Sequence, residues 1–208
     1  MQGEERRQKK AEMKREAILR SAAAAFRRKG FHGTSMEEIS EALLMTKGSL
    51  YYYFKDKEDI LYACHDFSLK RLEQHMAEIK AAEFEGDGQA AQRLALMIQG
   101  LVDVMIDDLQ GSALALDFGV LSAEQRAGII DRRDEFEHAM RHCVQQGIDS
   151  NEFRNVDAKM TTFAILGAIN WINQWYHPDG DLRARDIGKV YADLFVEGLK
   201  AGALPVIK

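Results

Sequence analysis

Proline is almost absent from this chain, and its absence limits what the chain can fold into. The two prolines, Pro178 and Pro205, both lie late in the sequence, so nothing before them breaks a helix. Good helix formers (Ala, Leu, Glu, Lys, Arg and Met) dominate, and no long run alternates polar and apolar residues. The sequence therefore predicts an all-α fold.

The composition is that of a globular chain with its own core. The chain has 208 residues, of which 46% are hydrophobic, enough for one or two domains. No apolar run reaches the length of about 18 residues that a membrane span needs. Cys64 and Cys143 are isolated and match no metal-binding spacing. We therefore expect a cytoplasmic protein with no membrane partner and no cofactor.

The charge is distributed unevenly along the chain. Residues 1–60 hold 13 Lys and Arg against 10 Asp and Glu, a net charge of +3, while the remainder carries −8 of the total of −5. The basic residues are densest in residues 6–16, at the start of a helix that Gly30 should end. A basic N-terminal part on an acidic body indicates that only this part meets a polyanion.

Three helix starts then follow within about two dozen residues. Ser35 and Glu38 form a capping-box pattern, Thr46 precedes the next helix, and Asp56 precedes the one after it. A turn must fall near Leu44 and Met45. Two short helices joined by a tight turn are typical of a helix-turn-helix motif, whose second helix enters the major groove of DNA.

The second short helix, "TKGSLYYYF" at residues 46–54, has a mixed character. Leu50 and Phe54 share one face and should anchor it. The outward set is Lys47, Gly48, Ser49, Tyr51, Tyr52 and Tyr53. Glycine permits close approach, and tyrosine can bond phosphate or cover a thymine methyl group. The alternative is an aromatic cluster that packs on the next helix, but three adjacent helical positions cannot all face one core.

Two segments, "AILRSAAAAFRRKGFHGTSMEEIS" and "MTKGSLYYYFKDKEDIL", together resemble the DNA-binding domain of TetR-family transcriptional regulators. The resemblance implies a DNA-binding domain at residues 1–58 and a ligand-binding and dimerisation domain at 59–208. It implies phosphate contacts from Ser35, Thr46, Ser49 and Lys57, base contacts from Lys47, Gly48 and Tyr51, and backbone contacts from Tyr52 and Tyr53. The family usually has Gly or Asn in the turn where this chain has Leu44, and a left-handed backbone strains leucine.

The C-terminal part should consist of helices at about 57–82, 90–109, 114–121, 122–147, 157–177 and 184–202. In the last helix, large and small residues alternate at spacings of three and four, which fits either an internal core or a partner helix. The resemblance favours the second reading, because the family's last two helices form a homodimer interface, and a two-fold dimer suits a palindromic operator.

The helix at 157–177 is apolar nearly all round and should be buried on both sides. Asn170 and Gln174 on it either bond neighbouring helices or line an effector cavity. The other expected lining residues are Phe67, Met105, Phe118, Arg133, Phe136, Met140 and Phe163. Its segment "AILGAINWINQWYHPDG" resembles regulators of fatty-acid and related acyl-CoA degradation. That resemblance implies an acyl-CoA effector, and we expect a medium, long or aromatic acyl group.

Other chemistries have less support. His138 and His142 are four residues apart beside Cys143, a spacing that can bind a metal, but no third ligand is evident. Adjacent carboxylates such as Glu37 and Glu38 point apart on a helix, and no nucleophile motif or phosphate loop appears.

Three functions remain. The favoured one is a repressor released from its operator by an acyl-CoA. The others are a DNA-binding regulator that answers a different hydrophobic effector or a partner protein, and a helical enzyme or lipid carrier.

Overall fold

The computed structural model describes residues 2–84, 86–107, 114, 116–177 and 179–202. These residues form eight helices, which confirms the predicted all-α fold. The helices are α1 (Gln2–Lys29), α2 (Met36–Ala42), α3 (Lys47–Tyr53), α4 (Lys57–Ala81), α5 (Gln89–Asp107), α6 (Ala123–Asp149), α7 (Ala158–Trp175) and α8 (Ala184–Leu199). None of the described helices is long and apolar enough to cross a membrane.

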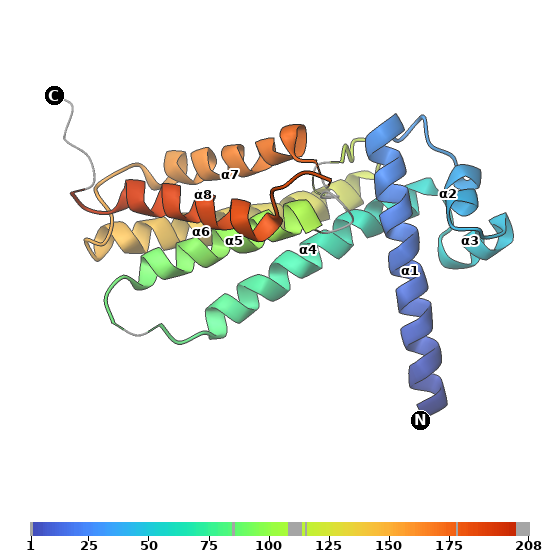
Figure 1. Ribbon diagram of the computed structural model, residues 1–208, viewed down its shortest axis with the longest axis horizontal. Helices are drawn as coiled ribbons and strands as arrows, with labels where there is room; N and C mark the ends of the chain where they lie inside the picture. Colours follow the sequence, from blue (N-terminus) through green and yellow to red (C-terminus); the bar gives the residue numbers. More distant parts are fainter. Residues whose placement is uncertain (1, 85, 108–113, 115, 178, 203–208) are drawn as a thin grey trace.

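The helices form an elongated molecule with α1, α2 and α3 at one end (Figure 1). From this end α4 runs along the body, where α5 packs against α4, α6, α7 and α8. The N-terminal half of α1 leaves the body and projects away from it (Figure 1). Because α2 and α3 lie beside the start of α4, the predicted helix-turn-helix occupies one tip of the molecule.

Side-chain caps fix the starts of α2, α3 and α4, as predicted. The side chains of Ser35, Thr46 and Asp56 accept hydrogen bonds from backbone N–H groups three residues later, at 3.1, 3.2 and 2.8 Å. The Glu38 carboxylate does not complete the capping box. It pairs instead with Arg28 at 2.9 Å and with Lys29 at 2.7 Å, and so ties α2 to the end of α1.

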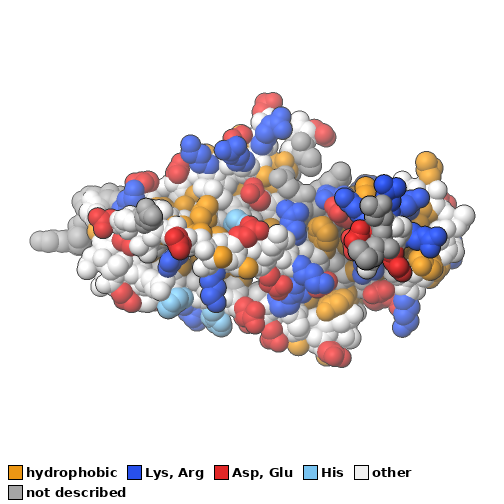
Figure 2. Space-filling view, turned by 90° about the horizontal axis from the view of Figure 1, so that it is seen from below, with side chains coloured by type: hydrophobic (Ala, Val, Ile, Leu, Met, Phe, Trp, Pro, Cys, Tyr) orange, Lys and Arg blue, Asp and Glu red, His pale blue; other side chains and the backbone are white. Residues whose placement is uncertain are grey.

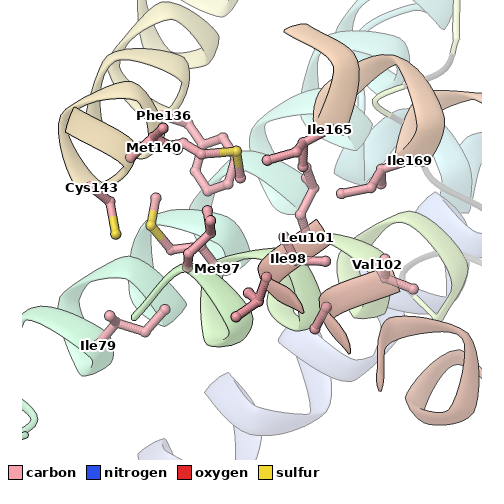
Figure 3. Close-up of a cluster of buried hydrophobic side chains, with 14 of the residues drawn as sticks. Ile79, Met97, Ile98, Leu101, Val102, Phe136, Met140, Cys143, Ile165 and Ile169 are labelled. Carbon is pink, nitrogen blue, oxygen red and sulfur yellow. The ribbon is translucent and has the colours of Figure 1, made fainter. Parts of the chain in front are cut away.

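The hydrophobic residues form two clusters, and α4 belongs to both. The first cluster joins α1, α2 and α3 to the residues of α4 up to Leu69. The second begins at Leu72 and fills the space between α5, α6, α7 and α8, where Phe136, Leu101 and Ile165 approach one another (Figure 3). The expected domain boundary at residue 58 falls in the first turn of α4, whereas the division between the cores falls three turns later.

Two features of the single chain differ from what the sequence predicts for its C-terminal part. Residues 116–121 form turns rather than part of a short helix, because the Asp117 carboxylate accepts the backbone N–H of Gly119 at 2.8 Å and competes with helical bonding. In the single chain, α7 is buried on only one of its two sides. Ile165 and Ile169 are fully buried, but Met160, Phe163 and Trp171 are 62%, 45% and 65% exposed.

The turn between α2 and α3 is left-handed at Leu44, which is the strained one of the two outcomes that the sequence left open. Leu44 has φ +51° and is 98% exposed. The Leu44 N–H bonds the Glu41 carbonyl at 3.0 Å, and the Met45 N–H bonds the Ser40 carbonyl at 2.9 Å. These two bonds make a Schellman ending, in which the left-handed position normally holds glycine.

Leu44→Gly should therefore stabilise the protein. Relief of a left-handed backbone is worth roughly 1–2 kcal/mol, offset by up to about 1 kcal/mol of added chain entropy in the unfolded state. Urea unfolding should show a free energy of unfolding that is raised by up to about 1 kcal/mol. Leu43→Gly is the control, because Leu43 has φ −102° and is half-buried, and it should destabilise. Equal destabilisation by both variants would contradict strain at Leu44.

Candidate functional site

The outer face of α3 is a rigid platform for polar and aromatic side chains. Leu50 and Phe54 are 0% and 1% exposed and anchor the helix to the first core, as predicted. Tyr51 and Tyr52 are 45% and 84% exposed. Their rings stand on a helix held by a cap at its start and by two buried side chains, so little conformational freedom remains to be lost on binding.

Gly48 lies open on this platform. A β-carbon built there would meet no other atom within 4 Å. The packing of the chain therefore does not require glycine at this position, which also has ordinary helical geometry. Glycine here leaves room for an approaching surface.

Lys47 is held in place by its neighbours in the free protein. Its ammonium forms an ion pair with Glu37 of α2 and lies 5.8 Å from the centre of the Tyr51 ring. The contact raises the pKa of Lys47 and lowers the pKa of Glu37. Glu37 occupies one of the three N–H donors of the ammonium, so a base or phosphate that Lys47 binds would share the ammonium with Glu37 or replace it.

Lys57 has a structural role that was not predicted from the sequence. Its ammonium donates to the carbonyls of Phe31 at 2.8 Å and Thr34 at 2.7 Å, and lies 4.4 Å from the centre of the Phe31 ring. Since an ammonium has three N–H donors, at most one remains for a phosphate. Lys57 thus fixes the loop before α2 against the start of α4.

The remaining expected DNA contacts surround the two helix starts. Ser35, Thr46 and Ser49 are exposed, and the hydroxyls of Thr46 and Ser49 lie 2.8 Å apart. Tyr53 is half-buried and turns toward α1, where its carbonyl accepts from Arg15 at 3.4 Å. The Arg15 guanidinium also lies 4.2 Å from the centre of the Phe54 ring. All nine residues expected at DNA therefore belong to this tip of the molecule.

A cavity of about 120 Å³ lies in the body between α4, α5, α6 and α7. Of the nine residues expected at an effector, four line it: Met105, Arg133, Phe136 and Asn170. The other lining residues are Leu69, Leu72, Leu101, Leu114 and Leu166. Leu69 and Leu72 were missed, although their spacing on α4 marks them as part of an inward stripe.

The other five expected effector residues lie elsewhere. Phe67 packs against the first core and Met140 is fully buried in the second. Phe163 is exposed on α7, and Gln174 lines a surface cavity beside Phe31. Phe118 lies next to the main cavity without lining it. The centre of its ring lies 5.3 Å from the centre of the His65 ring and 4.8 Å from the guanidinium carbon of Arg133. Asn170 is exposed rather than buried, so it lies at the mouth of the cavity.

Arg133 brings a positive charge to the wall of this apolar cavity. Its guanidinium donates to the Leu114 carbonyl at 2.7 Å, and among the described residues no carboxylate forms an ion pair with it. Burial lowers the pKa of Arg133. Burial, and then the charge of Arg133, lower the pKa of His65 to about 3, so His65 is neutral and adds no second positive charge to the site. A buried cation of this kind favours an anionic or strongly dipolar ligand.

A second cavity of about 210 Å³ lies on the other side of Leu69, Leu72 and Phe136. Arg132 borders it and joins α6 to α4 through ion pairs with Asp66 at 3.0 Å and Glu73 at 2.5 Å. Leu69, Leu72 and Phe136 thus lie between α4 and α6, and the ion pairs of Arg132 join the two helices. A ligand that displaced Phe136 would join the two cavities.

Neither cysteine has the surroundings of a reactive thiol. Cys64 and Cys143 are both free and buried, and burial raises the pKa of both thiols, that of Cys143 to about 11. The thiolate, which is the reactive form, is therefore scarce near neutral pH. Among the described residues, no group of three His, Cys, Asp or Glu side chains is placed to hold a metal ion.

Comparisons with known proteins agree with this geometry. Residues 18–64 match the family described as bacterial regulatory proteins, tetR family, and residues 87–199 match a tetracyclin repressor-like C-terminal domain. The chain is 25% identical over 197 residues to the transcriptional regulator AcrR of Shigella flexneri, covering 89% of this chain and 91% of AcrR.

Two solved structures of regulators are also similar. One is PfmR from Thermus thermophilus, with 28% identity, a TM-score of 0.76, and coverage of 88% of this chain and 99% of PfmR. The other is AibR in complex with isovaleryl coenzyme A and operator DNA, with 26% identity, a TM-score of 0.73, and coverage of 89% of this chain and 97% of AibR. The C-terminal match alone spans more than half of the sequence. With a helix-turn-helix at its tip, the chain belongs to the TetR family of DNA-binding transcriptional regulators.

Proposed function

We propose that this regulator is a repressor that an acyl-CoA releases from its operator. The observation that carries the proposal is the position of α4. Only three residues separate this helix from the end of α3, and its residues Leu69 and Leu72 line a cavity that Arg133 also lines. A ligand in that cavity therefore contacts the same rigid element that positions the helix-turn-helix.

The size of the cavity supports a mechanism in which the ligand moves α4. Sites for drug-sized ligands measure roughly 300–1,000 Å³, whereas this cavity measures about 120 Å³. An acyl chain of more than a few carbons enters only if Phe136 yields or if α4 moves away from α6. Tilting α4 would change the separation of the two α3 helices in a dimer, so ligand and operator favour different states of one equilibrium.

Energetic magnitudes favour a ligand with both an apolar chain and a charged group. Reversing a two-state equilibrium from 99:1 to 1:99 requires about 5.5 kcal/mol of differential affinity. At about 0.8 kcal/mol per buried methylene, roughly seven methylenes would be needed if apolar burial acted alone. The small cavity favours a shorter chain than the medium or long one expected from the sequence, with polar contacts from Arg133 and Asn170 supplying the rest. The complex of AibR with isovaleryl coenzyme A supports the same ligand class. A different hydrophobic effector is the alternative.

We also propose that α7 and α8 form the interface of a homodimer. Both helices pack on α5, yet they leave large apolar side chains in solvent. On α7, Met160 and Trp171 are 62% and 65% exposed, and on α8, Val190 and Leu194 are 64% and 63% exposed. Several large apolar side chains exposed on neighbouring elements support a protein interface there, and a two-fold dimer would present two α3 helices to a palindromic site.

Gly48→Ala should weaken operator binding without weakening the fold. The added methyl group meets nothing in the free chain, and alanine favours a helix by up to about 1 kcal/mol. If Gly48 faces a base edge, the same methyl group should cost roughly 1–3 kcal/mol of overpacking against DNA. Gly128→Ala on α6 is the control, because its β-carbon also meets open space. Unchanged operator affinity for Gly48→Ala in a titration by fluorescence anisotropy would refute close contact at this position.

Leu194→Glu should shift the protein from dimer to monomer. A carboxylate at the proposed interface would have to lose its hydration without a partner, a cost of several kcal/mol. Sedimentation velocity at micromolar concentration measures the outcome. Ile130→Glu is the control, since Ile130 is 45% exposed but belongs to α6 rather than to the two helices of the proposed interface. A wild-type monomer, or dissociation by both variants alike, would contradict the assigned interface.

Acyl-CoA thioesters should release wild-type protein from its operator, most effectively those with short or branched acyl groups, while CoA alone should act weakly. Arg133→Gln should bind the operator but lose the response, because the cavity loses its cation. Arg126→Gln is the control: Arg126 also bonds carbonyls of the 116–121 segment, at Gly119 and Leu121, but does not line the cavity. A gel-shift titration with graded acyl-CoAs tests this. Equal responses by the wild type and Arg133→Gln would remove Arg133 from the site.

A further inference from the structure

The N-terminal half of α1 is an arm that precedes the stretch of the chain that matches the tetR family. The match begins at residue 18, whereas α1 begins at Gln2. Residues 3–13 are all exposed, and the arm projects from the tip that carries α3 (Figure 1). Seen from below, Lys and Arg side chains gather around its free end (Figure 2). With about 1.5 Å of rise per residue, the arm extends roughly 20 Å beyond Arg15.

One side of the arm is basic and turned toward α3. Arg7, Lys10 and Lys14 recur at spacings of three and four, so they share a helix face. Together with Ala11, Met13 and Tyr53 they line a cavity of about 540 Å³ between the arm and the end of α3. Arg6 and Lys9 do not line it. The guanidinium of Arg15 donates to the Tyr53 carbonyl at 3.4 Å and fixes the arm to α3 at the base of this cavity.

The charges on this face have no counter-charge within the part of the chain that the structure describes. Among these residues, Arg7, Lys10 and Lys14 form no ion pair, whereas Arg20 in the packed half of α1 pairs with Glu16 at 2.6 Å. Like charges at spacings of three and four destabilise an isolated helix. A line of anionic groups against this face would remove the repulsion and hold the arm in its helical form.

We propose that the arm is a second DNA contact, which binds phosphates beside the half-site that α3 reads. The proposal rests on DNA binding through α3. Charge and position favour duplex DNA as the occupant, since the basic face is continuous with Tyr53 at the end of α3. From Arg7 to Lys14 the face spans about 10 Å, and one strand presents a phosphate per 3.4 Å of axis, so roughly three phosphates match it. Such contacts add affinity without sequence preference.

Two double variants of the full-length protein test the arm. Arg7→Ala/Lys14→Ala removes two charges that line the cavity beside α3, and Arg6→Ala/Lys9→Ala removes two charges of the same helix that do not line it. The operator is first selected with wild-type protein from a random duplex library, and affinity is then measured from about 50 to 200 mM salt. Losing two phosphate contacts should make the logarithmic salt slope shallower by about 2. The loss of affinity over that range should then be roughly tenfold smaller than in the wild type.

The expected result is this change in Arg7→Ala/Lys14→Ala with the order of sequence preferences unaltered, and little change in Arg6→Ala/Lys9→Ala. Amide hydrogen exchange should also show that operator DNA protects residues 3–13 in the wild type. Unchanged salt slopes in both variants, or equal changes in both, would overturn the arm as a directed contact while leaving DNA binding by α3 in place. A wild-type protein that selects no duplex would overturn the proposed function itself.

Discussion

The burial of α4 in two separate hydrophobic cores is the constraint on which the rest of the structure depends. Up to Leu69 its side chains complete the core of α1, α2 and α3, and from Leu72 they belong to the core of the body. A rigid helix shared in this way cannot tilt in one core without disturbing the other. The cavity lies where this change occurs, so a small movement at Leu69 and Leu72 reaches Lys57 and the loop that it holds.

The tip of the molecule is prepared for an anion by short contacts among its own charges. Lys47 rests on Glu37, and Glu38 ties α2 to Arg28 and Lys29. These exposed pairs contribute little stability, but they hold the cations near the positions at which phosphates would take over. If these cations bind phosphates as proposed, one anionic partner would be exchanged for another, which requires less reorganisation than bringing free side chains out of water.

Much of the fold could be predicted because local chemistry determines it. The caps at Ser35, Thr46 and Asp56 and the buried pair Leu50 and Phe54 all follow from residues within one or two turns, whereas the left-handed Leu44 was suggested only by the family resemblance. The cavity between α4, α5, α6 and α7 was only partly predictable. Its walls depend on how α4, α5 and α6 pack, and this brings Leu69 and Leu114 beside Arg133 across long stretches of sequence. The turn made by Asp117, and the solvent-facing side of α7, likewise depend on tertiary surroundings that periodicity does not contain.

The two cysteines have a consequence for how the folded state opens. Cys64 lies in the core of the tip and Cys143 in the core of the body, and each thiol is buried in the folded protein. Modification of either one therefore requires a local or global unfolding event. Each of the two cores thus contains one thiol whose labelling reports its opening. If α4 couples the cores so that they open together, the labelling rates of Cys64 and Cys143 should change in parallel when the protein is destabilised.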